Sequence, residues 1–147
     1  MNYLDTSALI KRYVREAASS AVDALIAQQA PVVTSKVTYA EMYSALARRR
    51  REGDLSPRAY AVASRQFEAE WAALVRVDVT DDVLAGARRL VERHPLRGFD
   101  AIHVASAITF AGDIGVAVTF AGADRRQLEA ARAEGLAVAD LTATPSP

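Results

Sequence analysis

The chain has no cysteine among its 147 residues. A disulfide framework and thiolate metal ligands are therefore excluded, and the composition suits a reducing compartment. Net charge is also absent, because 18 basic residues balance 18 acidic residues. Nucleic-acid binding thus gains no support from overall charge and would have to rest on local basic patches.

Long apolar runs are absent as well. No segment approaches the roughly 20 apolar residues that a membrane span needs, and the first apolar run is too short for a secretion signal and has no basic segment before it. We therefore expect a cytoplasmic protein that does not associate with a membrane. The length suits one domain with a full core. We expect this domain to cover residues 1–142, and residues 143–147 to form a flexible tail.

Short strand-like segments alternate with helical segments along the chain. The strands are predicted at 3–4, 31–34, 74–79, 115–120 and 136–138. Strands that alternate with helices indicate an α/β fold with a mostly parallel sheet covered by helices on both faces, a three-layer α/β/α sandwich. The segment from Ser35 to Leu74 contains no strand and is predicted to form a protruding pair of helices.

Three of the predicted helices differ in how much of their surface should be buried. Ser56 and Pro57 are typical of a helix start, and the stripe that follows has helical spacing: Tyr60, Ala63, Phe67 and Trp71. A helix after Thr80 should bury another face, made of Val83, Ala87, Leu90 and Val91. The segment 99–111 is apolar nearly all round, which predicts a buried helix.

Asp5 is the first of four acids at the ends of predicted strands or the starts of predicted helices. It directly follows the strand Tyr3-Leu4. An acid at the carboxyl end of a first strand lies where open α/β sheets bind ligands. Asp5 or Thr6 could equally cap the helix that follows.

Glu41 and Asp100 lie in the first turns of two predicted helices. Glu41 stands three residues after Thr38, the spacing of a capping box. Its neighbours one turn away are small or apolar, and a carboxylate in such surroundings needs a partner because burial of an unpaired charge is costly. Asp100 is a good N-cap residue. His103 shares its helix face and could be a metal ligand, a base, a residue that orients Asp100, or a polar residue satisfied locally.

Asp124 follows the strand predicted over 115–120. Its spacing to Gln127 is again that of a capping box. Asp113 precedes the same strand and should therefore lie at the opposite end of the sheet.

The four acids together favour a metal site. Asp5 and Asp124 follow strands, and helices that begin after strands face the same edge of a parallel sheet. Carboxylates brought within a few ångströms repel one another unless a cation neutralises them. A hard divalent ion such as Mg²⁺ prefers carboxylates, water and substrate phosphates. Such an ion activates water and stabilises charge on an attacked phosphate.

These segments resemble the motifs of the PIN-domain ribonucleases, in particular the VapC-type toxins of bacterial toxin–antitoxin pairs. The resemblance spans nearly the whole chain. The segment from Tyr3 to Leu9 resembles the first motif, Thr38 to Glu41 the second, and Phe99 to Ala107 the third, which is the most specific. Val118-Thr119, followed by Asp124 to Leu128, resembles the fourth.

The resemblance implies a Mg²⁺- or Mn²⁺-dependent endoribonuclease that cleaves single-stranded RNA, or structured RNA at exposed loops. It also implies a homodimer and a small inhibitory antitoxin. On this hypothesis Asp5, Asp100 and Asp124 hold the metal, while Glu41 binds directly or through water and positions the attacking water. The expected supporting residues are three hydroxyls and one imidazole: Thr6, Ser7, Thr119 and His103.

The last acid departs from the family pattern. The family usually has it closer to the threonine, whereas here Ala121-Gly122-Ala123 intervene. Asp124 would then reach the metal poorly, unless the glycine lets the loop fold back. A catalytically impaired PIN module that mainly binds a protein partner or RNA is therefore the alternative function.

Two other phosphoryl-transfer families fit less well. A response-regulator receiver needs an acid pair after the first strand and a lysine after the last active-site strand, and no lysine follows Lys36. A haloacid-dehalogenase-type phosphatase needs an aspartate where Ser7 stands.

A run of four arginines, Arg48, Arg49, Arg50 and Arg51, ends one helix of the predicted pair. Such a run could bind RNA phosphates. Cations at a helix C-terminus also interact favourably with the helix dipole, so a solvated helix end is the alternative interpretation.

Overall fold

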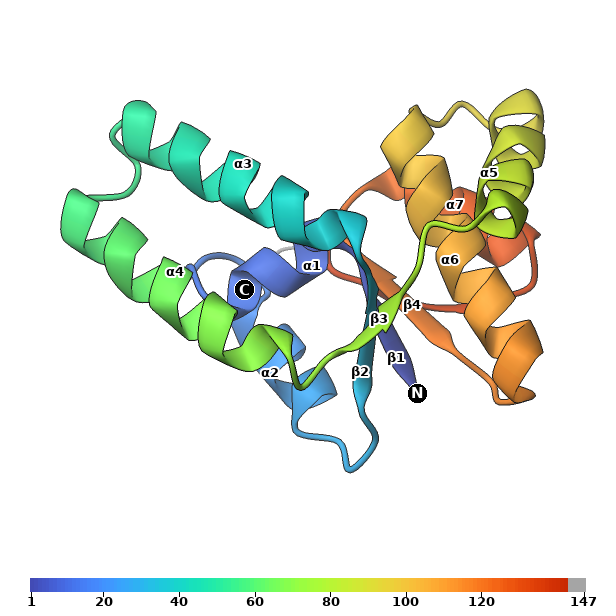
Figure 1. Ribbon diagram of the computed structural model, residues 1–147, viewed down its shortest axis with the longest axis horizontal. Helices are drawn as coiled ribbons and strands as arrows, with labels where there is room; N and C mark the ends of the chain where they lie inside the picture. Colours follow the sequence, from blue (N-terminus) through green and yellow to red (C-terminus); the bar gives the residue numbers. More distant parts are fainter. Residues whose placement is uncertain (143–147) are drawn as a thin grey trace, which may run out of the picture.

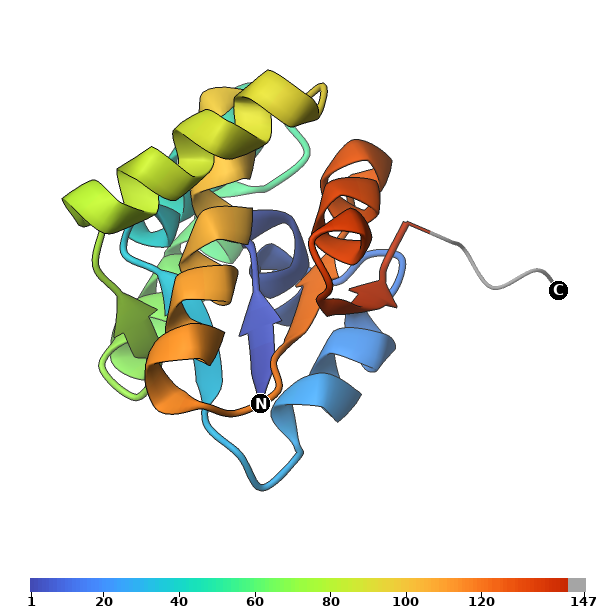
Figure 2. The ribbon, with the colours of Figure 1, turned by 90° about the vertical axis from the view of Figure 1, so that its right-hand side faces the viewer.

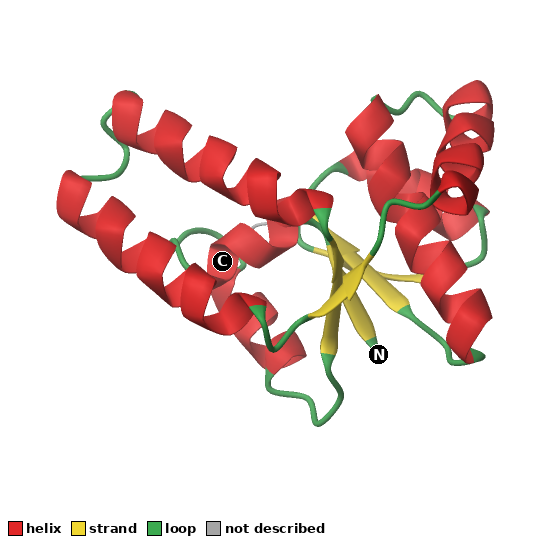
Figure 3. Cartoon of the chain, viewed as in Figure 1, coloured by secondary structure: helices red, strands yellow, loops and turns green. Residues whose placement is uncertain are grey.

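The computed structural model describes residues 1–142, and the tail predicted over 143–147 lies outside these residues. Five strands form one sheet between two groups of helices (Figures 1 and 3). The strands are β1 (Asn2–Leu4), β2 (Val32–Ser35), β3 (Val75–Val77), β4 (Thr119–Gly122) and β5 (Ala137–Asp140). The helices are α1 (Thr6–Leu9), the 3₁₀ helix η1 (Ile10–Arg12), α2 (Ser19–Ile26), α3 (Val37–Arg51), α4 (Pro57–Trp71), α5 (Asp81–Arg93), α6 (Gly98–Ile114) and α7 (Arg125–Ala133).

The strand order is β3-β2-β1-β4-β5, and all neighbouring strands are parallel. The first strand is therefore the central one. Asn2 pairs with Val32 on one side and with Thr119 on the other. The predicted parallel sheet is confirmed, and Asp5 follows its middle strand, where the neighbouring strands also end.

Two apolar clusters cover the two faces of the sheet, because successive strand side chains point to opposite faces. Tyr3 and Phe120 belong to one cluster together with residues of α5, α6 and α7. Leu4 and Ala121 belong to the other, with residues of α1 to α4. Figure 2 shows α6 in front of the sheet on the first of these faces. The predicted three-layer arrangement is confirmed.

The helices α3 and α4 form the predicted pair and extend away from the sheet (Figure 1). The hydroxyl of Ser56 accepts the N–H of Ala59 at 3.0 Å, and Pro57 is the first residue of α4, as expected. Ala63 and Phe67 are fully buried. A large part of the predicted stripe therefore packs inward.

Two apolar residues that were predicted to be buried, Val91 and Phe99, are exposed, and so is Ile114, which lies beyond the predicted segment 99–111. Val91 is 41% exposed, although it was expected on the inner face of α5. The helix α6 is buried over its first half, but Phe99 is 57% exposed at its start and Ile114 41% at its end. These positions lie on the outer side of α5 and at the two ends of α6, where no other layer covers them.

The start of β4 was also predicted wrongly. The expected strand over 115–120 begins only at Thr119 in the structure. The helix α6 continues to Ile114, and Gly115 is its C-cap. Gly115 has φ +64°, a left-handed conformation that glycine adopts without strain. In the described part of the chain, no helix combines the length and apolar character that crossing a membrane requires.

Candidate metal centre

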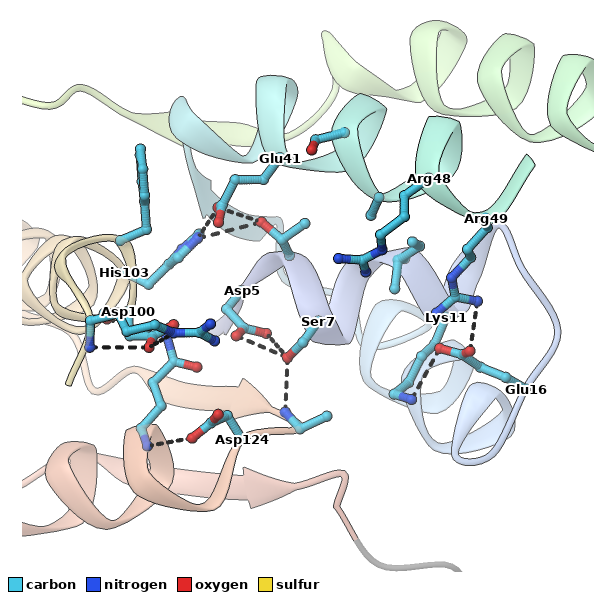
Figure 4. Close-up of a pocket in the computed structure, with 18 residues that line it drawn as sticks. Asp5, Ser7, Lys11, Glu16, Glu41, Arg48, Arg49, Asp100, His103 and Asp124 are labelled. Carbon is cyan, nitrogen blue, oxygen red and sulfur yellow. Dashed lines mark hydrogen bonds and ion pairs between the residues drawn. The ribbon is translucent and has the colours of Figure 1, made fainter. Parts of the chain in front are cut away.

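A cavity of about 690 Å³ opens at the carboxyl ends of the central strands. All four predicted acids line it, and each comes from a different part of the chain (Figure 4). Asp5 follows β1, Glu41 lies on α3, Asp100 lies in the first turn of α6, and Asp124 precedes α7. The fold therefore brings together the acids that the sequence singled out.

Asp5 is a buried carboxylate, with 4% of the residue exposed. Its Oδ1 accepts the N–H of Ala8 at 2.9 Å, so it caps α1 while it also faces the cavity. The hydroxyl of Ser7 donates to the same carboxylate, 2.7 Å from Oδ1 and 2.9 Å from Oδ2. Burial raises the pKa of the Asp5 carboxyl, and the hydrogen bonds and nearby His103 oppose this only in part. No ion pair to Asp5 occurs within residues 1–142.

Glu41 is bound by two side chains that lie far from it in the sequence. Its Oε1 accepts hydrogen bonds from the Thr6 hydroxyl at 2.8 Å and from His103 Nε2 at 2.6 Å. Burial alone would raise the pKa of the Glu41 carboxyl, but these two hydrogen bonds outweigh it and hold the pKa below its ordinary value. Glu41 therefore stays ionised inside a partly buried site.

The alternative role predicted for Glu41, the acid of a capping box, is wrong. The helix α3 begins after Lys36, and the hydroxyl of Thr38 pairs with that of Thr34 at 2.8 Å instead of a backbone N–H. Likewise, His103 does not hydrogen-bond to Asp100. Its two nitrogens contact residues of β1, α1 and α3.

Asp100 is the third residue of α6 and not its N-cap, the alternative role that the sequence offered for it; the N-cap is Arg97. Asp100 Oδ2 accepts hydrogen bonds from the backbone N–H of Arg97 and from its Nε, both at 3.3 Å. The Arg97 side chain is 86% exposed, so this ion pair is weak and easily exchanged. Asp100 is thus held at the cavity by a contact that a stronger cation can replace.

Asp124 reaches the cavity despite the inserted residues. Two of these, Ala121 and Gly122, continue β4, so the insertion lengthens the strand instead of looping out. The N–H of Ala123 then donates to the Ser7 hydroxyl at 2.9 Å, which ties the turn to the residues around Asp5. Asp124 caps α7 by accepting the N–H of Gln127 at 3.1 Å.

Gln127 does not complete a capping box with Asp124. Its side-chain nitrogen donates to the backbone oxygen of Asp100 at 3.2 Å, which links α7 to α6. Thr119 is the supporting residue that was predicted wrongly. It is the first residue of β4, at the end of the strand away from the cavity, and does not line it.

The donor set suits a hard divalent cation, because carboxylate and hydroxyl oxygens are the ligands that Mg²⁺ and Mn²⁺ prefer. Within residues 1–142, no three His, Asp or Glu side chains converge closely enough to form a ready-made metal site. The acids share one cavity, but Asp100 and Asp124 each still engage one oxygen in a helix-start hydrogen bond. Metal binding would therefore need these two side chains to turn from their helix-start hydrogen bonds toward Asp5.

The four arginines at the end of α3 separate into different environments. Arg48 and Arg49 line the cavity. Arg49 donates to Glu16 at 2.8 Å, and Arg50 lies over the ring of Tyr60 at 4.4 Å. Arg48 forms no ion pair with another described residue and extends from α3 toward Ser7 (Figure 4). Of the run, Arg48 is therefore the residue best placed to meet an anion in the cavity.

Two basic residues of the cavity were not identified from the sequence. Lys11 lies one turn after Ser7 and pairs with Glu16 at 3.2 Å, and Arg97 stands three residues before Asp100. Their spacing to Ser7 and Asp100 could have identified both residues, since side chains three or four residues apart share a helix face.

Comparisons with known proteins agree with this fold. The PIN domain family matches residues 3–133. The chain is 38% identical to Ribonuclease VapC45 of Mycobacterium tuberculosis over 143 residues, which cover 97% of each chain. The segments that carry the acids lie inside the matched regions.

Two solved structures resemble the fold. One is M. tuberculosis VapC20, described as a toxin that cleaves the sarcin-ricin loop, with a TM-score of 0.63, 21% identity, and coverage of 92% of this chain and 96% of that one. The other is a toxin–antitoxin complex from Klebsiella pneumoniae. It has a TM-score of 0.53 and 19% identity, and the match covers 81% of this chain and 84% of that one. At these identities the structures support the fold alone.

Proposed function

Because this chain belongs to the PIN-domain family, we propose that residues 1–142 act as one PIN domain, a metal-dependent endoribonuclease that serves as the toxin of a toxin–antitoxin pair. Ribonuclease VapC45, which matches nearly the whole chain, is named as a ribonuclease. We expect the protein to act on RNA in the cytoplasm.

One observation supports the metal site above others. Asp5 is buried without a cation partner in the described chain and faces a cavity lined by three further acids. A buried carboxylate without a compensating cation is costly, so a cation is the natural partner of this group. We propose that Asp5, Asp100 and Asp124 hold Mg²⁺ or Mn²⁺, with Glu41 binding directly or through water.

The residues of the chain have distinct roles in the proposed reaction. A bound divalent ion supplies an activated water and stabilises charge on the attacked phosphate. Glu41 remains ionised and positions the attacking water. Ser7 orients Asp5 and fixes the turn before Asp124, while Thr6 orients Glu41.

Arg48 is proposed to bind a phosphate of the RNA next to the scissile one. It is exposed, lines the cavity and lies on the same face of α3 as Glu41, seven residues away. The substrate is proposed to be single-stranded RNA or an exposed loop of structured RNA. The description of VapC20 as a loop-cleaving toxin supports the second form.

Two protein partners are proposed. The Klebsiella complex resembles this fold and contains an antitoxin, which supports a small cognate antitoxin for this chain. A homodimer is proposed from the family resemblance alone.

A catalytically impaired PIN module that mainly binds a partner is the second candidate. The lack of three converged metal ligands in the described residues favours it. RNA cleavage assayed with Mg²⁺, with Mn²⁺ and with EDTA separates the two functions. Cleavage that EDTA abolishes supports the enzyme, whereas RNA binding without cleavage under all three conditions supports the impaired module.

A further inference from the structure

A chain of hydrogen bonds runs from the core to the cavity through three layers of the fold. The hydroxyl of Tyr3, on β1, lies 2.8 Å from Nδ1 of His103, on α6. The other ring nitrogen, Nε2, lies 2.6 Å from Oε1 of Glu41, on α3 (Figure 4). Tyr3 and His103 are 0% and 2% exposed, so water does not compete for these contacts.

The directions of the hydrogen bonds follow from the chemistry of the end groups. An ionised carboxylate only accepts, so Nε2 of His103 must carry a hydrogen and donate it to Glu41. In a ring that carries one hydrogen, Nδ1 then accepts, and the Tyr3 hydroxyl is the donor in reach of it at 2.8 Å. Burial raises the pKa of Tyr3 well above its ordinary value, so this hydroxyl keeps its hydrogen. The Tyr3 hydroxyl thus selects one tautomer and one orientation of the imidazole.

The two carboxylate oxygens of Glu41 differ in their hydrogen bonds. Oε1 accepts from both Thr6 and His103. Oε2 has no hydrogen-bond partner among the described residues, although Glu41 lines the cavity. An oxygen fixed by two donors leaves the other oxygen in a defined position for a ligand or a water.

We propose that Tyr3 is a positioning residue: its hydroxyl fixes His103, and His103 together with Thr6 fixes Glu41 so that Oε2 is left free in the cavity, where it would bind a metal ion or a water. This inference rests on the proposed function and adds a residue that does not line the cavity. Hydrogen-bond partners of metal-site residues commonly change metal affinity or activity by about 10- to 100-fold when removed.

The substitution Tyr3→Phe separates this role from core packing. It removes the hydroxyl and keeps the ring, which stacks on Phe120 with a centroid distance of 5.4 Å and an interplanar angle of 13°. Tyr13→Phe is the matched control, because it also removes a hydroxyl that donates to a side chain, Glu70 at 2.9 Å, outside the cavity. Both variants should retain the fold.

Three readouts test the proposal. Nitrogen NMR of the His103 ring should report the Nε2–H tautomer in the wild type and a tautomer mixture in Tyr3→Phe. Mg²⁺ affinity by calorimetry and kcat for RNA cleavage should fall by about 10-fold or more in Tyr3→Phe, with KM for RNA unchanged. Tyr13→Phe should match the wild type in all three.

A double-mutant cycle shows whether Tyr3 acts through His103. In a His103→Ala background, Tyr3→Phe should change Mg²⁺ affinity no further. Wild-type tautomer and wild-type Mg²⁺ affinity in Tyr3→Phe, or an undiminished effect in the His103→Ala background, would overturn the proposal. A wild type that cleaves no RNA would overturn the proposed function instead, and the NMR measurement would still test the Tyr3–His103 pair.

Discussion

The backbone of Gly122 lies directly against the carboxylate of Asp5. A methyl group at position 122 would stand 3.5 Å from Cγ and Oδ2 of Asp5 and 3.3 Å from the ring of Phe120. A side chain at the last residue of β4 would therefore contact the central acid of the proposed metal site and crowd the ring of Phe120.

Gly122→Ala is expected to weaken Mg²⁺ binding and RNA cleavage. The methyl group crowds Phe120 and fills space beside the Asp5 carboxylate, and such overpacking costs about 1–3 kcal/mol of stability. Gly112→Ala is the control, since a methyl group there meets no atom within 4 Å and the position is inside α6. The control should gain about 0.5–1 kcal/mol and bind Mg²⁺ normally. Equal Mg²⁺ affinity in the two variants would exclude a role for Gly122 in the site.

Arg48→Gln is expected to weaken RNA binding and to flatten its salt dependence. Each phosphate contact with a single strand contributes about 0.7 to the slope of log K against log salt concentration, so the slope should fall by about that amount. Arg51→Gln is the control, because Arg51 is exposed and does not line the cavity. Identical slopes for the two variants would show that the arginines form a solvated helix end.

Glu16 is expected to stabilise the protein only above acidic pH. Burial alone would raise its pKa, but Arg49 and Lys11 outweigh this and lower it. A carboxyl whose pKa is lowered in the folded state adds stability above its unfolded pKa, and this stability is lost as the pH falls through the folded pKa.

Glu16→Gln should therefore be less stable than the wild type at about pH 7, by about 1 kcal/mol in the free energy of unfolding. The difference should shrink as the pH falls through the lowered pKa of Glu16. Thermal melts at decreasing pH test the expectation. Glu52→Gln, at an exposed position after α3, serves as the control. A difference from the wild type that does not change with pH would attribute the effect of Glu16→Gln to packing.

Asp5→Asn is expected to stabilise the protein when divalent ions are removed. The substitution keeps an oxygen to accept the Ala8 N–H and removes a buried charge that lacks a cation partner in the described chain. A gain of about 1 kcal/mol would raise the melting temperature by about 4 °C. Mg²⁺ should then raise the melting temperature of the wild type but not of Asp5→Asn. A wild-type melting temperature that Mg²⁺ leaves unchanged would contradict the site.

The sequence predicted the elements and the acids because both depend on local patterns. Asp5 could be placed at the carboxyl edge of the sheet, since it directly follows a short apolar segment. The partners of Glu41 could not be predicted, because His103 is 62 residues away and meets it only through the way α3 and α6 pack on the sheet. For His103 the sequence left several roles open, of which a contact with Asp100 on the same helix was one.

The position of Thr119 was predicted wrongly for a different reason. Residues 115–118 are as apolar as a strand, so the pattern did not show that the hydrogen-bonded ladder starts only at Thr119. Asp124 was expected to be displaced for another reason, because three residues more than in the family pattern separate it from the threonine. The strand β4 ends at Gly122, so only Ala123 separates its end from this acid.

RNA cleavage by the wild type, Asp5→Asn and Asp113→Asn in Mg²⁺ tests the central claim most directly, with EDTA as the metal-free reference. Asp113 is exposed near the end of α6 and lies outside the cavity, so it provides a matched loss of charge. Metal-dependent cleavage is predicted to fall by about 100-fold or more in Asp5→Asn, beyond the loss typical of outer hydrogen-bond partners, and to persist in Asp113→Asn. Full Mg²⁺-dependent cleavage by Asp5→Asn would contradict the account.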